Sequence, residues 1–154
     1  MNGWLLDTLL FRYLAMEGGD RKPSFRDWVR RNGESIFLST ISLVEIKTRI
    51  KRVGEARRVA AVDHWLKDIV GRHRERILRV DAEVAMRAGA LINLRSQKLA
   101  GDRRSLFDPL LAATAEIHDL GLLTDRIDAF SPWAPKIEFC DPFELGPRDK
   151  HDSG

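Results

Sequence analysis

The sequence predicts an α/β protein with a parallel sheet that carries helices on both faces. Short, almost wholly apolar runs such as Trp4–Leu6 and Leu122–Thr124 are typical of central strands that are buried on both sides. These runs alternate with longer segments whose apolar residues recur every three or four positions, as they do in amphipathic helices. Right-handed crossovers place the carboxyl ends of parallel strands at one edge of the sheet, where such sheets bind their ligands.

The composition predicts one soluble domain. We place it at residues 1–147 of the 154, with a flexible polar tail at residues 148–154. A formal net charge of +3 permits nucleic acid as a partner without establishing it. The single cysteine, Cys140, excludes an internal disulfide and favours a reducing cytoplasm. Asp7 interrupts the N-terminal apolar run, so we expect neither a signal peptide nor, from the remaining runs, a membrane span.

The elements follow from periodicity and from residues that begin or end helices. Strands are expected over residues 4–6, 36–38, 77–80, 122–124 and, at a sheet edge, 137–139. Helices are expected over residues 8–17, 25–31, 42–53, 55–74, from 82 onward, and 109–119.

Six residues predict where helices begin or end. Ser42 and Glu45 have the spacing of a capping box, and Asp81 caps the helix that follows it. Asp108 is expected at the N-cap of the helix over residues 109–119, with Pro109 at its first position, where the missing N–H costs nothing. Gly121 is expected to close that helix in the left-handed conformation.

Acidic residues gather at the predicted carboxyl edge of the sheet. Asp7 leaves the first strand, and Glu45 lies in the first turn of the helix after the second strand. Asp108 lies at the start of the helix before the fourth strand, and Asp125 and Asp128 follow that strand. Purely structural roles also fit, because Glu45 completes a capping box and Asp108 caps a helix.

This grouping indicates a metal site. A carboxylate at the end of a buried strand is costly unless it is paired or liganded, and several carboxylates at one point repel each other. Oxygen-rich acidic sites suit Mg²⁺ or Mn²⁺, which activate water and stabilise charge on a phosphate. The sequence lacks a second Asp two residues after Asp7, a phosphate-binding glycine loop and a G-x-S-x-G elbow. The chemistry therefore favours phosphodiester hydrolysis.

At this point the chain resembles the PIN-domain ribonucleases, and among them the VapC-type toxins of toxin–antitoxin pairs. The resemblance spans about Trp4 to Phe143 and depends on five segments in order. They are LLDT at 5–8, LSTISLVEI at 38–46, RILRVD at 76–81, FDPLLAATA at 107–115, and GLLT at 121–124 with Phe130 six residues after Thr124.

The resemblance implies a three-layer α/β/α sandwich with a mostly parallel five-stranded sheet, and Mg²⁺- or Mn²⁺-dependent cleavage of RNA such as tRNA. Asp7, Glu45 and Asp108 match the family's metal-binding acids, and Thr8 matches a position that supports the site by hydrogen bonding. The family also implies a homodimer and a cognate antitoxin. Phe11, Tyr13, Trp28 and Trp65 are candidates for an apolar groove that receives this partner, with core packing as the alternative for Trp65.

Two departures from the family pattern concern the site. Leu9 stands where Asn usually follows Asp-Thr, and the final motif carries its acids one residue early, with Arg126 and Ala129 at the usual positions of Asn and Asp. We expect at least one of Asp125 and Asp128 to point toward Asp7 and Asp108, with Asp125 favoured. In the alternative, Asp125 caps a turn and Asp128 pairs with Arg126 or with solvent.

Two functions stay open at this point. In the first, the chain is an active endoribonuclease whose Arg12, Arg49, Arg103 and Arg104 hold the RNA backbone, although plain surface charge explains these arginines equally well. In the second, it is a catalytically weakened binding module that acts through its antitoxin and that partner's DNA binding. No base-reading pattern identifies a particular RNA.

Overall fold

The centre of the protein is a five-stranded sheet in strand order β3-β2-β1-β4-β5. The structure, a computed structural model, describes residues 2–11, 13, 23–51, 56–96, 106–134 and 136–144. The strands are β1 (Trp4–Leu6), β2 (Ile36–Ser39), β3 (Ile77–Leu78), β4 (Gly121–Leu123) and β5 (Phe139–Cys140). All four strand pairings are parallel. The predicted α/β class and its five-stranded parallel sheet are confirmed.

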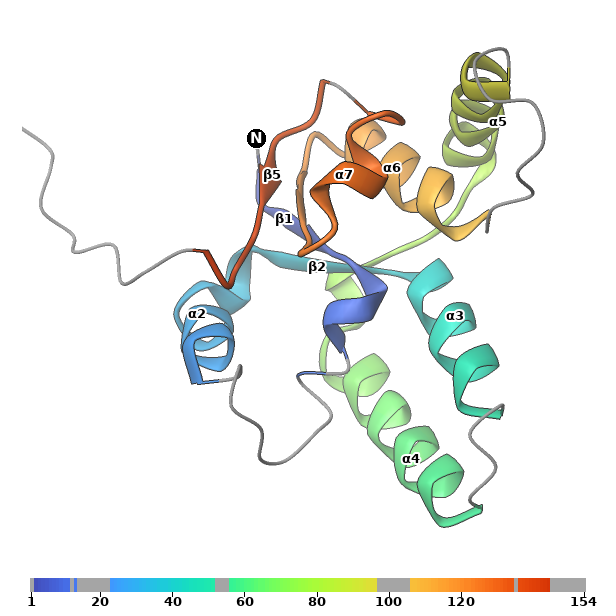
Figure 1. Ribbon diagram of the computed structural model, residues 1–154. Coiled ribbons are helices and arrows are strands. Elements are labelled where there is room, and N and C mark those ends of the chain that lie inside the picture. The colour runs from blue at the N-terminus through green and yellow to red at the C-terminus, as the bar shows by residue number, and fades with distance from the viewer. Residues whose placement is uncertain are drawn as a thin grey trace, which may run out of the picture.

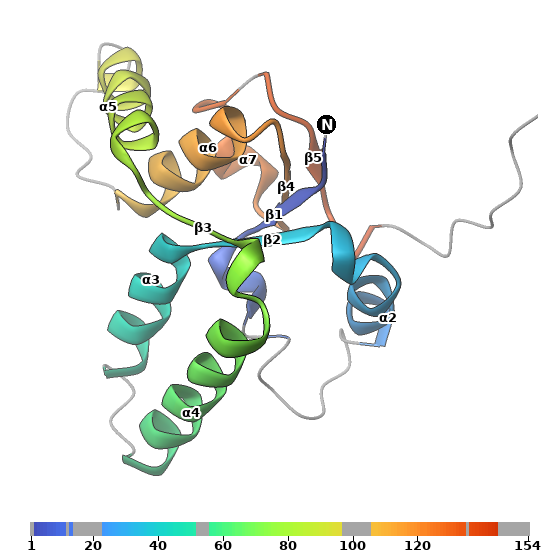
Figure 2. The ribbon, with the colours of Figure 1, turned by 180° about the vertical axis from the view of Figure 1, so that it is seen from behind.

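Helices cover both faces of this sheet, as Figures 1 and 2 show from opposite sides. α5, α6 and α7 lie on one side, α2 and α4 lie on the other, and α3 leaves the carboxyl end of β2. The α-helices are α2 (Pro23–Asn32), α3 (Thr40–Lys51), α4 (Ala56–Arg72), α5 (Ala82–Ser96), α6 (Phe107–Ile117) and α7 (Ile127–Phe130). The 3-10 turns are η1 (Thr8–Leu10), η2 (Gly33–Ser35) and η3 (Arg74–Arg76). In the part of the chain that the structure describes, no helix has both the length and the apolar character that crossing a bilayer requires.

The pleat of the central strands divides the core into two clusters. Successive side chains of a strand point to opposite faces, so Leu5 and Leu122 join one cluster while Leu6 and Leu123 join the other. The first cluster contains buried residues of α5 and α6, and the second contains Phe25 of α2, with Trp65 and Ile69 of α4 packed against it. In β1 and β4 every residue except the half-buried Trp4 is therefore shielded from water, as the apolar sequence of these strands predicts.

The predicted capping box at Ser42 is wrong. α3 begins two residues earlier, at Thr40, and the N–H of Ile41 donates to Ser39 Oγ at 3.2 Å. The Ser42 hydroxyl is buried and accepts a hydrogen bond from Thr8 Oγ1 at 3.0 Å. A contact with a distant residue thus uses the hydroxyl that the local pattern assigned to a helix end. Asp81, by contrast, caps α5 as predicted, since its carboxylate accepts from the N–H of Val84 at 3.0 Å.

The predicted ends of α6 are each displaced. The helix begins at Phe107 with Leu106 at the N-cap, so Asp108 lies within the first turn rather than capping it. At the other end the left-handed residue is Asp119, with φ of 52°, while Gly121 belongs to β4. Asp tolerates this conformation better than most residues, and the carbonyl of Asp119 accepts from the N–H of Asn2 at 3.0 Å.

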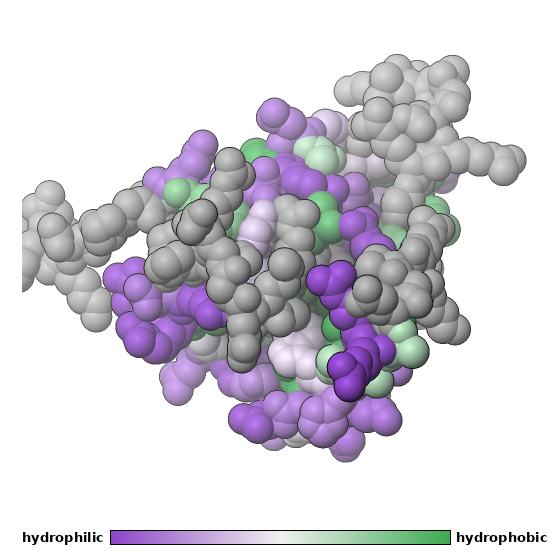
Figure 3. Space-filling model, turned by 60° about the horizontal axis from the view of Figure 1, so that its bottom comes forward, coloured by the Kyte–Doolittle hydropathy of each residue, from purple (hydrophilic) through white to green (hydrophobic). Residues whose placement is uncertain are grey.

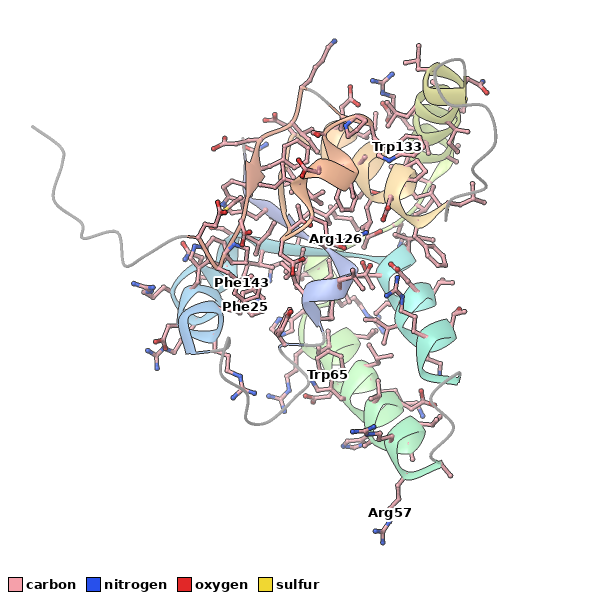
Figure 4. The ribbon with its side chains drawn as sticks, viewed as in Figure 1. Phe25, Arg57, Trp65, Arg126, Trp133 and Phe143 are labelled. Atoms are coloured by element: carbon pink, nitrogen blue, oxygen red, sulfur yellow. The ribbon has the colours of Figure 1, made fainter. Side chains whose placement is uncertain are left out.

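The aromatic residues that predicted a groove pack into the second core cluster instead. Phe11 is buried and meets Trp65 edge-on, with ring centroids 6.0 Å apart. Tyr13 meets Phe143 edge-on at 5.1 Å, and Phe143 lies beside Phe25 at α2 (Figure 4). The coloured surface around this side is mostly hydrophilic, with hydrophobic residues only in small separate areas (Figure 3). Core packing, the alternative interpretation for Trp65, therefore also applies to Phe11 and Tyr13.

Some predictions lie outside the described residues. Most of the helix expected over residues 8–17 is among them, although Thr8–Leu10 form η1 and Phe11 and Tyr13 are helical. The tail at residues 148–154 lies outside as well, so the proposed division at residue 147 stays a prediction.

Gly3 gives a test of the fold at the entrance to β1. Its φ is +150°, and an added Cβ would lie 2.5 Å from the carbonyl oxygen of Ser35. We expect Gly3→Ala to lower the free energy of unfolding by about 2 kcal/mol, because the strained backbone and the overlap act together. Urea unfolding measures this change. Gly89→Ala is the matched control, since its added Cβ in α5 would meet no described atom within 4 Å beyond the backbone of its own helix. It should raise stability by about 0.5–1 kcal/mol, and equal effects at both positions would contradict the assignment.

Candidate functional site

Asp7 is a fully buried carboxylate at the carboxyl end of β1. Its N–H donates to the carbonyl of Leu123 at 2.9 Å, so the pairing of β1 with β4 continues one residue past the strand. The chain then turns into η1, and Asp7 Oδ1 accepts from the N–H of Leu9 at 3.3 Å. The residue is thus held by backbone on both sides, which fixes its carboxylate at the predicted edge of the sheet.

Thr124 joins the carboxyl ends of the two central strands. Its buried hydroxyl donates to Asp7 Oδ2 at 2.7 Å. The hydroxyl oxygen of Thr124 in turn accepts from the N–H of Arg126 at 3.0 Å, which sets the direction of the chain after β4. One hydroxyl therefore orients both the buried acid and the residue that compensates its charge.

Arg126 bridges Asp7 and Asp108. Its Nε donates to Asp7 Oδ2 at 3.1 Å, and its Nη2 donates to Asp7 Oδ1 and to Asp108 Oδ1, both at 3.1 Å. The guanidinium also lies 5.0 Å from the ring centroid of Phe130, within range of a cation–π interaction. Figure 4 shows this side chain near the centre of the molecule, close to the point where β1 passes into η1.

The surroundings of Arg126 strongly favour its charged form. Burial by itself lowers the pKa of Arg126. The hydrogen bond and charge of Asp7, and then the charge and hydrogen bond of Asp108, outweigh burial and raise that pKa above its ordinary value. Removing one partner of such a buried pair leaves the other charge uncompensated, which typically costs about 3–5 kcal/mol.

Asp108 reaches this point because α6 packs closely on the sheet. The buried residues Ala112, Ala113 and Ala115 have short side chains that allow the helix to approach β1 and β4. Asp108 lies in the first turn of α6, where the helix dipole favours a negative charge. Its side chain remains about one-fifth exposed, so the pair that it forms with Arg126 is open to solvent on one side.

Glu45 is buried on α3 and is only half satisfied. Its Oε1 accepts from Arg49 Nη2 at 2.5 Å, one helical turn along α3. Among the residues that the structure describes, its Oε2 has no hydrogen-bond partner. The bond between Thr8 and Ser42 ties η1 to α3 three residues before Glu45, which holds this helix against the end of β1. Thr8 therefore supports the elements that carry the acids, rather than donating to Asp7 itself.

The two remaining acids differ in burial. Asp125 is half-buried, and its buried Oδ1 has no hydrogen-bond partner within the described part of the chain. Asp128 is exposed in the first turn of α7. Arg126 bonds to Asp7 and Asp108, whereas the exposure of Asp128 fits the other half of the alternative, in which this acid meets solvent. That Asp125 or Asp128 serves the site stays a prediction.

Of the four arginines predicted to contact RNA, the structure describes one. Arg49 is half-exposed and pairs with Glu45, so it lies beside a predicted acid. Arg12, Arg103 and Arg104 lie outside the described residues.

The donor chemistry of these residues fits a divalent cation. Carboxylate oxygens are the ligands that Mg²⁺ and Mn²⁺ prefer. The partnerless oxygens of Glu45 and Asp125 are buried acceptors of the kind that a cation satisfies. Within the described ranges, however, no three acidic, histidine or cysteine side chains are grouped as a metal site. In this conformation the cation that Asp7 and Asp108 share is the guanidinium of Arg126.

Sequence reasoning missed the roles of Arg126 and Thr124. It noted Arg126 as a departure from a family pattern and as a possible partner of Asp128, and Thr124 as the end of a strand and part of a family segment. The rule that brought the acids together applies to these residues as well, because they follow β4 at the same edge. A cation in the short segment just after a central strand is the signal that identifies Arg126.

Comparison with known proteins supports this fold. A family model described as PIN domain matches residues 4–126, while curated protein sequences give no match. FitAcB from Neisseria gonorrhoeae is similar with a TM-score of 0.74 and 22% identity, over 92% of this chain and 99% of that one. DNA-bound VapBC from Salmonella typhimurium gives 0.68 and 20%, over 92% and 99%. VapBC-5 from Mycobacterium tuberculosis, of the VapBC family of toxin–antitoxin systems, gives 0.59 and 18%, over 90% and 98%. At these identities the likeness shows a shared fold.

The double role of Thr124 can be tested by removing only its hydroxyl. Thr124→Val keeps the shape but deprives Asp7 of a donor, so we expect the free energy of unfolding to fall by about 1–3 kcal/mol. Thr114→Val is the matched control, because its buried hydroxyl donates to the carbonyl of Leu110, one turn back in α6. That carbonyl keeps its backbone partner, and a loss below about 1 kcal/mol is expected. Chemical unfolding compares the two, and equal losses would argue against a special role for Thr124.

Proposed function

The chain belongs to the PIN-domain family, and from this premise we propose that it is a metal-dependent endoribonuclease, the toxin of a toxin–antitoxin pair in the cytoplasm. The observation that supports this most is the buried Asp7, which shares a cationic partner with Asp108. These carboxylates meet at the edge where open parallel sheets bind their ligands. A buried acid pair at that edge suits chemistry on a phosphodiester.

In this proposal Asp7, Glu45 and Asp108 hold Mg²⁺ or Mn²⁺, and Asp125 or Asp128 assists them. Such an ion supplies activation of the attacking water and stabilisation of negative charge on the phosphate. Thr124 keeps the Asp7 carboxylate oriented through its 2.7 Å hydrogen bond. The bond from Thr8 to Ser42 keeps α3, and with it Glu45, against the end of β1.

The proposed substrate is RNA, with structured RNA such as tRNA as the class that the family suggests. Arg12, Arg49, Arg103 and Arg104 hold its phosphates. The mildly basic chain, with a formal net charge of +3, is compatible with a polyanion. Arg49 is half-exposed, so it can reach a phosphate when it leaves Glu45.

The proposed protein partners are a cognate antitoxin and a second copy of this chain. Support comes from the structures that share the fold, since VapBC-5 belongs to a family of toxin–antitoxin systems and other VapBC and FitAB structures hold DNA. A small neighbouring gene encoding the antitoxin is the expected genetic context.

A second function, that of a catalytically weakened binding module, is favoured by two observations. Arg126 neutralises the acids that would hold the metal, and Leu9 replaces a polar support of Asp7. A chain that is not toxic, binds no metal and still binds the product of the neighbouring gene would favour this alternative. Toxicity on expression that disappears with Asp108→Asn would argue against it.

Loss of one charged ligand tests the nuclease proposal. We expect Asp7→Asn and Asp108→Asn each to lower the rate of RNA cleavage by about 100-fold or more, because several kcal/mol of charge stabilisation is lost. Cleavage is measured with Mn²⁺ or Mg²⁺, with and without chelator. Asp68→Asn is the control, since this exposed acid on α4 pairs with Arg72 one turn along the same helix. Activity that survives both chelation and Asp7→Asn would overturn the proposal.

The fourth acid has a separate test. A fourth carboxylate acts mostly through water molecules that the ion retains, so its loss should reduce activity less than the loss of Asp7. We expect Asp125→Asn to raise the Mn²⁺ concentration needed for half-maximal cleavage about tenfold, as loss of an outer ligand typically does, and more than Asp128→Asn does. If neither substitution shifts the metal dependence, the site works with three acids.

A further inference from the structure

Two of this chain's own arginines neutralise its three principal acids. Arg126 pairs with Asp7 and Asp108, and Arg49 pairs with Glu45. We infer that Arg126 is a built-in counter-ion of the Asp7–Asp108 pair, which a divalent cation must displace, so that Arg126 sets the affinity of the site for metal. This inference rests on the proposed function, because it concerns the same carboxylates.

The competition follows from which atoms Arg126 uses. Its Nη2 is 3.1 Å from one oxygen of Asp7 and 3.1 Å from one oxygen of Asp108. Its Nε engages the other oxygen of Asp7 at 3.1 Å. Both oxygens of Asp7 therefore already accept from a cation. A divalent ion on the same acids would compete for these oxygens and would be repelled by the guanidinium beside it.

Arg126 is anchored at several points, unlike a surface arginine that happens to meet an acid. Thr124 Oγ1 accepts from its N–H at 3.0 Å, and its guanidinium lies over Phe130. Its side chain is 27% exposed. Arg49, by comparison, is 52% exposed and meets Glu45 within a single helix. Arg49 therefore has fewer contacts to lose than Arg126, so the displacement of Arg126 weakens metal binding more.

The same contacts keep the metal-free protein folded. Asp7 is fully buried, so without a cation its charge would lack a strong partner. A substitution of Arg126 should consequently lower stability without metal and tighten metal binding at once. An arginine with a merely structural role would do only the first, or would weaken metal binding by disordering the acids. The opposite signs of the two effects distinguish the roles.

The experiment titrates the full chain with Mn²⁺ and measures free Mn²⁺ by electron paramagnetic resonance. We expect Arg126→Gln to bind Mn²⁺ at least about tenfold more tightly than the unsubstituted chain, because charge-assisted hydrogen bonds no longer have to be broken. Arg126→Lys keeps the positive charge but loses the planar guanidinium that bonds both acids at once. This variant should bind Mn²⁺ with intermediate affinity. Thermal unfolding of Arg126→Gln should begin lower without Mn²⁺ and rise more when Mn²⁺ is added.

Arg87→Gln is the matched control. Arg87 forms a two-point pair with Glu116 at 3.0 and 2.8 Å, and its side chain is 32% exposed, close to the value for Arg126. Its loss should lower stability and leave Mn²⁺ affinity unchanged. If Arg126→Gln does not fold without metal, Arg126→Lys decides the question by the same titration.

Three results would overturn the inference. Equal Mn²⁺ affinity with and without Arg126 would show that the guanidinium does not compete, and weaker affinity in Arg126→Gln would make it a support of the site. If neither the unsubstituted chain nor any variant binds Mn²⁺, the inference fails together with the metal dependence of the proposed function. The first two results leave that function intact, so the two failures are distinguishable.

Discussion

The buried charge of Asp7 is the constraint on which this end of the molecule depends. A carboxylate that is fully removed from water needs donors or a cation, and here it receives both. The backbone of η1, the hydroxyl of Thr124 and the fork of Arg126 all donate to its two oxygens. These donors come from the loops after β1 and β4, so satisfying a single side chain also joins the carboxyl ends of the two central strands.

The scaffold supplies this arrangement through ordinary packing. The pleat of β1 and β4 directs leucines into a cluster on each face, and the helices that cover them carry the remaining acids. Short alanine side chains let α6 lie close to the sheet, which brings Asp108 within reach of Arg126. The hydrogen bond from Thr8 to Ser42 holds α3, which carries Glu45, against η1 at the end of β1. The packing of the core therefore also sets the positions of the acids in the site.

Charge balance gives the departures from the family pattern a physical meaning. The acids after β4 stand one residue early, and Arg126 takes the position where the family has an amide. The result is a cation inside a cluster of carboxylates, which relieves their mutual repulsion when no metal is bound. If the acids hold an ion as proposed, the contacts of Arg126 that satisfy Asp7 and Asp108 in the metal-free form are also the contacts that the ion would have to replace.

Local patterns in the chain were enough to predict the five strands, the α/β class, the cap at Asp81 and the burial of Asp7, because each depends on periodicity or on a residue's place relative to its strand. Contacts between distant segments set the rest. Ser42 accepts a hydrogen bond from Thr8 instead of forming a capping box, and Asp108 lies in the first turn of α6 rather than at its N-cap. Arg126 binds Asp7, which lies 119 positions away in the sequence. Such contacts depend on which strand ends the sheet brings together, and no local sequence pattern predicts that arrangement.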